Sequence, residues 1–304
     1  MQQPKVKVLY VAGFERSGST ILNRVLGQID EFVAWGELRD IWQHGIAENR
    51  SCTCGELFAD CPAWQEVFDV AFNGTDNLDI QEISKLQSKT RSMVLPHHFG
   101  FLKDKHFLQK ASQYLNNIEK LYQAIQISTG CKVIVDSTKA SWYGYILRML
   151  PSIDLYTVHI VRNPKGVCYS LEQRKRKGEP ECQWYNPLHA SLSWNLKNYL
   201  VEMLLNSSSK ERYLRIRYED FIQNPQTVVK QILSILNEKN KELPFIDKTT
   251  VKMYEDHIIT GSPSSRSDTG TVRLSLDEKW QQHLNQFDRN IINFFTFLIG
   301  KKIL

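Results

Sequence analysis

Five short apolar segments are spaced along the chain as the buried strands of a parallel sheet would be. The first, Lys5–Ala12, is rich in β-branched residues and is followed by a glycine and by hydroxyl residues that suit a helix start, which predicts a helix at Ser19–Leu26. The other four segments are Phe32–Trp35, Lys132–Asp136, Leu155–Val161 and Tyr213–Tyr218. Strands that alternate with helices need crossover connections. The pattern therefore predicts an α/β fold with a central parallel sheet of about five strands flanked by helices.

The intervals between these strands are long and predict helical insertions. Residues 38–131 and 171–212 are expected to be mostly helical, with clear helices at Leu38–Ile46, Phe107–Ile127 and Leu188–Leu205. Residues 73–105 and 174–190 show the least pattern and are expected to be loops that carry specificity. Because no linker separates two halves, residues 1–304 are expected to form a single domain.

Composition narrows the possible partners. The chain is 42% hydrophobic with a formal charge of +5, which suits anionic ligands. Nucleic acid is not expected, because the basic residues are dispersed apart from the run Arg174–Lys177, and such a run is usually a solvated surface. The first residues do not resemble a signal peptide, and no segment approaches the roughly 20 apolar residues of a membrane span. A cytoplasmic enzyme is expected.

Three of the six cysteines are clustered, at Cys52, Cys54 and Cys61. A disulfide framework is not expected in a chain of this kind. With His44 nearby the three thiols could ligate zinc, but their spacing is not that of the usual paired knuckles. A loop held by packing, or reversible redox chemistry, is favoured, and no metal is expected.

The segment Gly13-Phe-Glu-Arg-Ser-Gly18-Ser19-Thr20 has the spacing of a phosphate-binding loop between a strand and a helix. Glycines allow the turn that points backbone N–H groups at an anion, and the helix start adds its own donors. Candidate binding residues are Arg16, Ser17, Gly18, Ser19 and Thr20. Ser19 stands where a nucleoside triphosphatase has lysine, so a nucleotide without a γ-phosphate fits better. A dinucleotide site is disfavoured because Glu15 occupies a position that requires glycine.

Further motifs occur in order along the chain. They are Cys52-Thr-Cys54-Gly55 with Cys61-Pro62, Asp136-Ser137-Thr138-Lys139, Arg162-Asn163-Pro164 with Ser170, Arg217-Tyr218-Glu219-Asp220, and His257 to Gly270 followed by Trp280. Together with the loop, this set resembles the bacterial-type branch of the sulfotransferase superfamily. That family uses 3′-phosphoadenosine 5′-phosphosulfate (PAPS) and releases the 3′,5′-bisphosphate (PAP).

The resemblance implies which residues bind the donor. The loop would hold the 5′-phosphosulfate, and Arg162 and Ser170 the 3′-phosphate, with Arg266 reaching in from the C-terminal loop. Asn163 departs from the commoner aspartate of the family. Arginine at position 162 can make a bidentate contact that lysine cannot reproduce.

Glu37, in the segment Trp35-Gly-Glu-Leu-Arg39, is similar to the general base of tyrosylprotein-type relatives, and it could instead be an acid at a helix start. Arg39 and Lys139 are further candidate catalytic residues, and His97 and His98 compete with Glu37 for the role of base. The resemblance implies transfer to a hydroxyl or amine of a small-molecule, lipid-like or sugar acceptor. A P-loop kinase or triphosphatase and a non-catalytic nucleotide-binding module are the alternatives. The sequence does not fix the oligomeric state.

Overall fold

The computed structural model describes residues 5–179, 182–183, 185–206, 211–261 and 269–303. At its centre is a five-stranded sheet with the order β2-β3-β1-β4-β5, in which every neighbouring pair is parallel. The strands are β1 (Val6–Gly13), β2 (Phe32–Ala34), β3 (Val133–Lys139), β4 (Ile153–Val161) and β5 (Tyr213–Arg217). All five predicted strands and the predicted α/β fold are thus confirmed.

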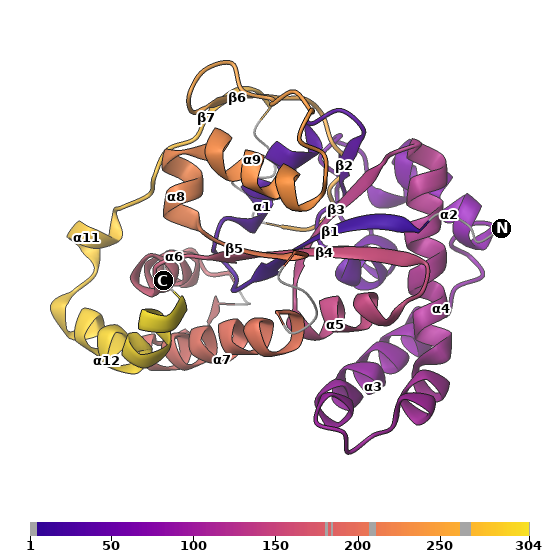
Figure 1. The fold of residues 1–304 in the computed structure, drawn as a ribbon, viewed down its shortest axis with the longest axis horizontal. Helices are drawn as coiled ribbons and strands as arrows, with labels where there is room; N and C mark the ends of the chain where they lie inside the picture. The colour runs from indigo at the N-terminus through magenta and orange to yellow at the C-terminus, as the bar shows by residue number, and fades with distance from the viewer. Residues whose placement is uncertain (1–4, 180–181, 184, 207–210, 262–268, 304) are drawn as a thin grey trace.

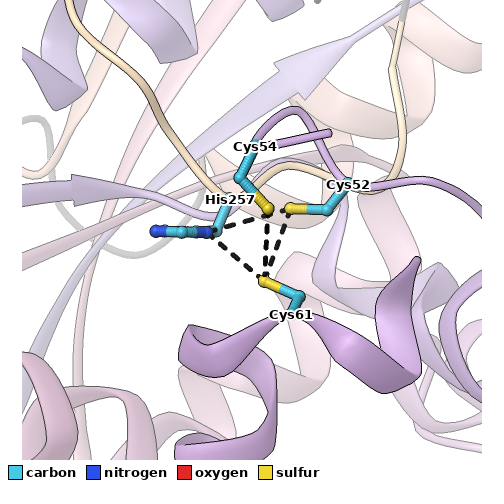
Figure 2. Close-up of side chains that lie close together, drawn as sticks. All are labelled: Cys52, Cys54, Cys61 and His257. Carbon is cyan, nitrogen blue, oxygen red and sulfur yellow. Dashed lines mark hydrogen bonds between the residues drawn. The ribbon is translucent and has the colours of Figure 1, made fainter. Parts of the chain in front are cut away.

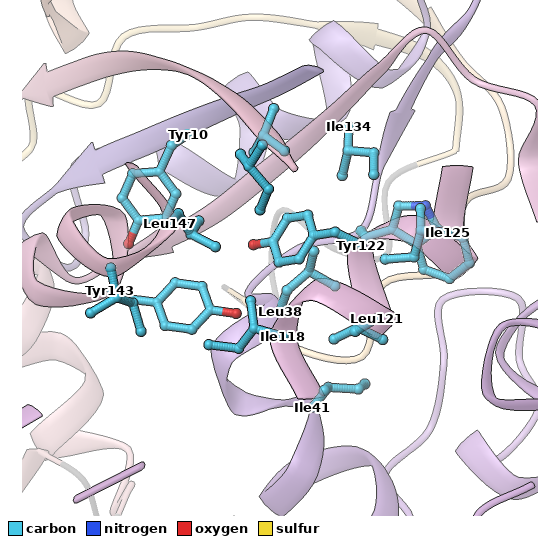
Figure 3. Packing of buried hydrophobic residues seen from close by; sticks show 14 of the residues in the cluster. Tyr10, Leu38, Ile41, Ile118, Leu121, Tyr122, Ile125, Ile134, Tyr143 and Leu147 are labelled. Carbon is cyan, nitrogen blue, oxygen red and sulfur yellow. The ribbon is translucent and has the colours of Figure 1, made fainter. Parts of the chain in front are cut away.

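Helices cover both faces of the sheet (Figure 1). One face carries α1 (Ser19–Gly27), α8 (Tyr218–Gln223) and α9 (Pro225–Ile235), and the other carries α4 (Asp104–Thr129), α5 (Ser141–Met149) and α7 (Pro187–Leu205). The two faces have separate hydrophobic cores, and side chains of a strand point alternately to each face. Leu9 and Val11 of β1 therefore pack in the first core, under α1, α8 and α9, whereas Val8 and Tyr10 pack in the second core, under α4, α5 and α7. In the second core, Tyr10 lies near Tyr122 of α4 and Tyr143 of α5 among aliphatic side chains (Figure 3).

The insertion between β2 and β3 contains α2 (Pro62–Phe72), α3 (Ile80–His98) and α4. The prediction of a loop over residues 73–105 is therefore wrong for most of its length. The buried positions of α3 are Ile83, Leu86, Thr90 and Val94, which recur at helical spacing. Because one of these buried positions is a threonine and the residues between them are mostly polar, the helical periodicity of hydrophobic residues is not apparent in the sequence.

Residues 38–47 are also less regular than the helix expected there. They form a short 3₁₀ helix, η1 (Leu38–Asp40), followed by a π-helix, η2 (Ile41–Ala47). A third short turn, η3 (Phe58–Asp60), precedes α2. Between β4 and β5, α6 (Pro164–Arg176) and α7 occupy both ends of the segment that was expected to be a loop at 174–190.

The C-terminal part adds an antiparallel pair that the sequence pattern did not predict, β6 (Thr250–Met253) with β7 (Gly270–Arg273). The chain ends with α11 (Trp280–His283) and α12 (Gln286–Ile303), and α12 packs on α6 and α7. Over the described residues, no helix has both the length and the apolar character needed to cross a membrane.

The order of the strands determines where a ligand can bind. From β1 the chain passes through α1 to β2 on one side of β1, and from β3 it passes through α5 to β4 on the other side. Ligands of open α/β sheets bind at the carboxyl ends of the strands where the order reverses. The carboxyl ends of β1, β3 and β4 meet at this point.

Candidate active site

A cleft of about 340 Å³ opens at the carboxyl ends of the strands. Segments that follow all five strands contribute to it, and residues 260, 261 and 277 of the C-terminal part complete the wall. Its volume lies in the range of roughly 300–1,000 Å³ typical of ligand pockets. The charged and hydroxyl side chains of its lining are Glu15, Arg16, Ser19, Thr20, Glu37, Asp40, His44, Arg50, Lys139, Arg162, Ser170, Arg174, Tyr218, Thr260 and Asp277.

The loop after β1 needs its second glycine. Gly18 is the N-cap of α1 with φ 86°, in the left-handed region, and a Cβ there would lie 2.4 Å from the Tyr218 ring. Among the described residues no side chain caps this helix, and the buried hydroxyl of Ser17 has no hydrogen-bond partner. Gly18, Ser19 and Thr20 line the cleft. The backbone donors of the helix start can therefore serve an anion in the cleft.

Arg16 of this loop and Arg162, which follows β4, connect their two segments by hydrogen bonds. Arg16 Nε donates to Ser170 Oγ at 2.9 Å, and Arg162 Nη1 donates to the Arg16 carbonyl at 3.0 Å. Burial, followed by repulsion from Arg174 and Arg162, lowers the pKa of Arg16. Arg16 is half-buried and Arg162 is buried, and their positive charges repel one another, so an anion bound between them would be stabilised.

Several contacts fix Arg162 in place. Its guanidinium lies 4.5 Å from the centre of the Tyr218 ring, and its carbonyl accepts from Trp194 Nε1 at 3.2 Å. A Cβ at Gly166 would approach Arg162 Nε to 3.1 Å, so glycine leaves the arginine its room. Asn163 caps α6 by accepting from the backbone N–H of Lys165 at 3.0 Å. The change from aspartate to asparagine therefore keeps the cap.

Glu37 and Lys139 form an ion pair across the cleft-side ends of β2 and β3. Their side chains are only 14% and 13% exposed. The backbone N–H of Glu37 donates to Thr260 Oγ1 at 3.0 Å, which links the C-terminal part to the backbone of the residue that bears the carboxylate. Lys139 has a left-handed backbone, with φ 69°, and its Nζ lies 3.4 Å from the Ser137 carbonyl.

Asp136 holds the two segments that carry this ion pair. Its fully buried carboxylate accepts from the backbone N–H groups of Leu38 and Thr138, at 3.4 and 2.8 Å, and from the Tyr122 hydroxyl at 2.5 Å. Burial raises its pKa to about 6, against the opposing effect of these hydrogen bonds. Asp136 is thus a positioning residue for Glu37 and Lys139.

Four of the predicted residues lie elsewhere within the described part of the chain, outside the set that lines the cleft. Ser17, a member of the loop, is fully buried. Arg39 makes a bidentate contact with Asp40, with both N–O distances 2.7 Å. His97, at the end of α3, contacts the Tyr145 hydroxyl at 2.8 Å and Asp104 at 2.9 Å, and His98 follows it. Arg266 lies outside the described residues.

The structure also brings in residues that the sequence reasoning missed. Arg174 lines the cleft, while the other members of its basic run, residues 175–177, are exposed as expected for a solvated surface. Asp40, His44 and Arg50 surround the Glu37 side of the cleft. Their only signal in the sequence is their position shortly after Glu37.

The comparisons with known proteins agree with this geometry. A family model described as the sulfotransferase family matches residues 9–242. A sulfotransferase domain from the olefin synthase of Synechococcus PCC 7002 superposes with a TM-score of 0.51 and 17% identity, over 97% of this chain and 96% of that one. A sulfotransferase domain from the curacin biosynthetic pathway gives a TM-score of 0.51 and 19% identity, over 97% and 99%. No protein of curated function matches the chain in sequence.

Proposed function

Because the chain belongs to the sulfotransferase family, which implies a PAPS-dependent transferase, we propose that it moves a sulfuryl group from PAPS to a hydroxyl or amine acceptor and releases PAP. The observation that carries this proposal is the direct contact between two cationic segments at the ends of β1 and β4. Arg162 donates to the carbonyl of Arg16, and Arg16 donates to Ser170. The two candidate anion sites, one at the loop after β1 and one at Arg162 and Ser170, are therefore neighbours. A nucleotide that carries one phosphate group on each side of a single ribose could occupy both.

The donor would lie across this contact. The loop residues Arg16–Thr20 and the start of α1 offer backbone N–H groups to the 5′-phosphosulfate. Arg162 and Ser170 would hold the 3′-phosphate, and Arg266 is proposed to assist from the C-terminal loop. The cradle at Gly18, the half-buried Arg16 and the buried Arg162 all fit such a ligand.

The reaction needs one base and one group that stabilises the leaving phosphate. Glu37 takes the proton of the acceptor hydroxyl or amine as its oxygen or nitrogen attacks sulfur. The bond between sulfur and the bridging oxygen breaks, and its electron pair remains on the phosphate of PAP. We propose that the Lys139 ammonium, which pairs with Glu37, neutralises that charge. Arg39 is proposed to act indirectly, through Asp40.

The acceptor is proposed to be a small-molecule, lipid-like or sugar compound. Asp40, His44 and Arg50 line the cleft together with Glu37, and they favour a polar group next to the reacting atom. They place no restriction on the remainder of the acceptor.

Replacement of the base tests this function. Glu37→Gln is expected to keep PAP affinity within a few-fold, because it leaves both anion sites intact, while turnover with labelled PAPS falls by roughly 10²–10⁴-fold. Glu66→Gln, the same change at an exposed carboxylate on α2, is the matched control. Unchanged turnover in Glu37→Gln would remove Glu37 from the mechanism.

A further inference from the structure

Three cysteines and a histidine from distant parts of the chain meet beside the β2 end of the sheet. The donor atoms of Cys52, Cys54, Cys61 and His257 all lie within 4.8 Å of one another (Figure 2). Over the described residues, this is the one group of three or more His, Cys, Asp or Glu side chains with such spacing. None of the four lines the cleft.

The spacing within this group is that of a tetrahedral metal site. Sγ of Cys61 lies 3.7 Å from Sγ of Cys52 and 3.7 Å from Sγ of Cys54. Nδ1 of His257 lies 3.3 Å from Cys61 Sγ and 3.9 Å from Cys52 Sγ. A tetrahedral zinc with Zn–S bonds of about 2.3 Å and Zn–N bonds of about 2.0–2.1 Å requires S–S and S–N separations of about 3.8 and 3.6 Å.

We propose that Cys52, Cys54, Cys61 and His257 bind one structural Zn²⁺ ion. Three thiolates and one imidazole are a donor set that zinc prefers, and four protein ligands leave no open position for substrate. The three cysteines lie in residues 52–61 and the histidine lies in the C-terminal part of the chain, and the fold brings these two segments together. The fourth ligand is His257 rather than His44, whose Nδ1 lies 3.0 Å from Glu48.

The local structure of the loop explains how adjacent thiols turn toward one centre. The backbone N–H of Gly55 donates to the Cys52 carbonyl at 3.0 Å, in a turn that requires φ 96° at the glycine. Cys61 is the N-cap of α2, followed by Pro62 at the first helical position. The spacing that is unusual for a zinc knuckle thus results from a turn followed by a helix start.

Further contacts attach the second segment to the first. The His257 carbonyl accepts from Trp64 Nε1 at 2.9 Å, and the Thr53 N–H donates to the Ile258 carbonyl at 3.1 Å. Trp35 packs at 4.4 Å from Trp64 and 6.4 Å from His257, between ring centres. Such supporting contacts orient the ligands of a metal site.

This position gives the metal a role in holding the active-site wall. Three residues after His257, Thr260 accepts the hydrogen bond from the N–H of Glu37, and Gly261 lines the cleft. A zinc ion that ties residues 52–61 to His257 would therefore fix the segment 257–261, whose Thr260 supports the backbone of Glu37. This consequence rests on the proposed function, whereas the metal site itself does not.

Metal analysis of the purified chain tests the site. Wild-type protein is expected to contain about one zinc per chain by elemental mass spectrometry. Cys61→Ser and His257→Asn are expected to lose it, whereas Cys131→Ser, at a buried cysteine outside the group, should retain it. Protein loaded with Co²⁺ should show the visible absorption of tetrahedral cobalt thiolate, which reports the ligands without any requirement for activity.

Two results would overturn the proposal. One is wild-type protein that takes up no zinc or cobalt when purified under reducing conditions. The other is a Cys61→Ser variant that is folded by circular dichroism and keeps its metal. If a variant does not fold, the wild-type stoichiometry and cobalt spectrum still decide. Because these measurements need neither PAPS nor acceptor, their failure is distinguishable from failure of the sulfotransferase mechanism.

Discussion

At the scale of single residues, Asp136 connects the stability of the protein to the geometry of its active site. It is fully buried, and its carboxylate accepts hydrogen bonds from the segments that bear Glu37 and Lys139. An ionised carboxylate at this position organises the site but is costly to bury. Its effect on folding should therefore depend on pH.

We expect the stability contributed by Asp136 to fall as pH rises. The folded-state pKa is raised to about 6 from an ordinary value near 4, so the folded state binds the proton more tightly than the unfolded state. The contribution is full below about pH 4 and is lost through about pH 6. Relative to Asp136→Asn, wild type should lose about 3 kcal/mol of unfolding free energy over this window.

Urea denaturation of both proteins across pH 4 to 7 measures this difference, because all other titrating groups are shared. A difference between the two proteins that stays constant over this range would show that the carboxyl group does not titrate with a raised pKa.

The sequence predicted part of the site for a clear physical reason. Glu37, Lys139 and Arg162 each follow a predicted strand, and parallel strands bring their carboxyl ends to one edge of the sheet. Arg174 could not be predicted in this way, because it lies in the last turn of α6 and not at the end of a strand. His257 could not be assigned to the cysteines either, since 196 residues separate it from Cys61.

At the scale of elements, the strands were predictable and parts of the helical insertions were not. A buried parallel strand is almost entirely apolar, as β1 is apart from Lys7, so its signal does not depend on periodicity. Helix α3 depends on periodicity alone, and Thr90 and the polar composition of the segment obscure it. The strands β6 and β7 have only four residues each, and β7 is mostly exposed, so they show neither a continuous apolar run nor a clear periodicity.

The junction between β1 and α1 allows a test at this scale. Gly18→Ala is expected to weaken PAP binding at least about tenfold, because its Cβ would collide with the Tyr218 ring and distort the loop. Gly100→Ala is a matched control: its φ of 79° is also left-handed, yet a Cβ there meets nothing within 4 Å.

Calorimetric titration with PAP measures the affinity of both variants, and their melting temperatures report the common backbone strain of about 1–2 kcal/mol. Wild-type affinity in Gly18→Ala would contradict the assignment of the anion site to this loop.

At the scale of the whole molecule, the fold brings polar and charged side chains from most of the chain to the carboxyl ends of the strands. Residues from the first strand through the C-terminal part line the cleft. We propose that residues 1–304 form one domain, which is supported by the packing of α12 on α7 and of β6 on α1. The family model ends at residue 242, yet Thr260, Gly261 and Asp277 complete the wall of the cleft.

We propose that the loop after β1 and Arg162 hold the two phosphate ends of one nucleotide. Calorimetric titration of wild type and Arg162→Lys with PAP, 5′-AMP and ATP, with and without Mg²⁺, tests it most directly. Wild type should bind PAP about 10–100-fold more tightly than 5′-AMP, since charge-assisted hydrogen bonds contribute about 1.5–3 kcal/mol. Arg162→Lys should lose most of that preference. Equal affinities for PAP and 5′-AMP, or tighter Mg²⁺-dependent binding of ATP, would show that these two segments do not bind the two phosphates of PAP.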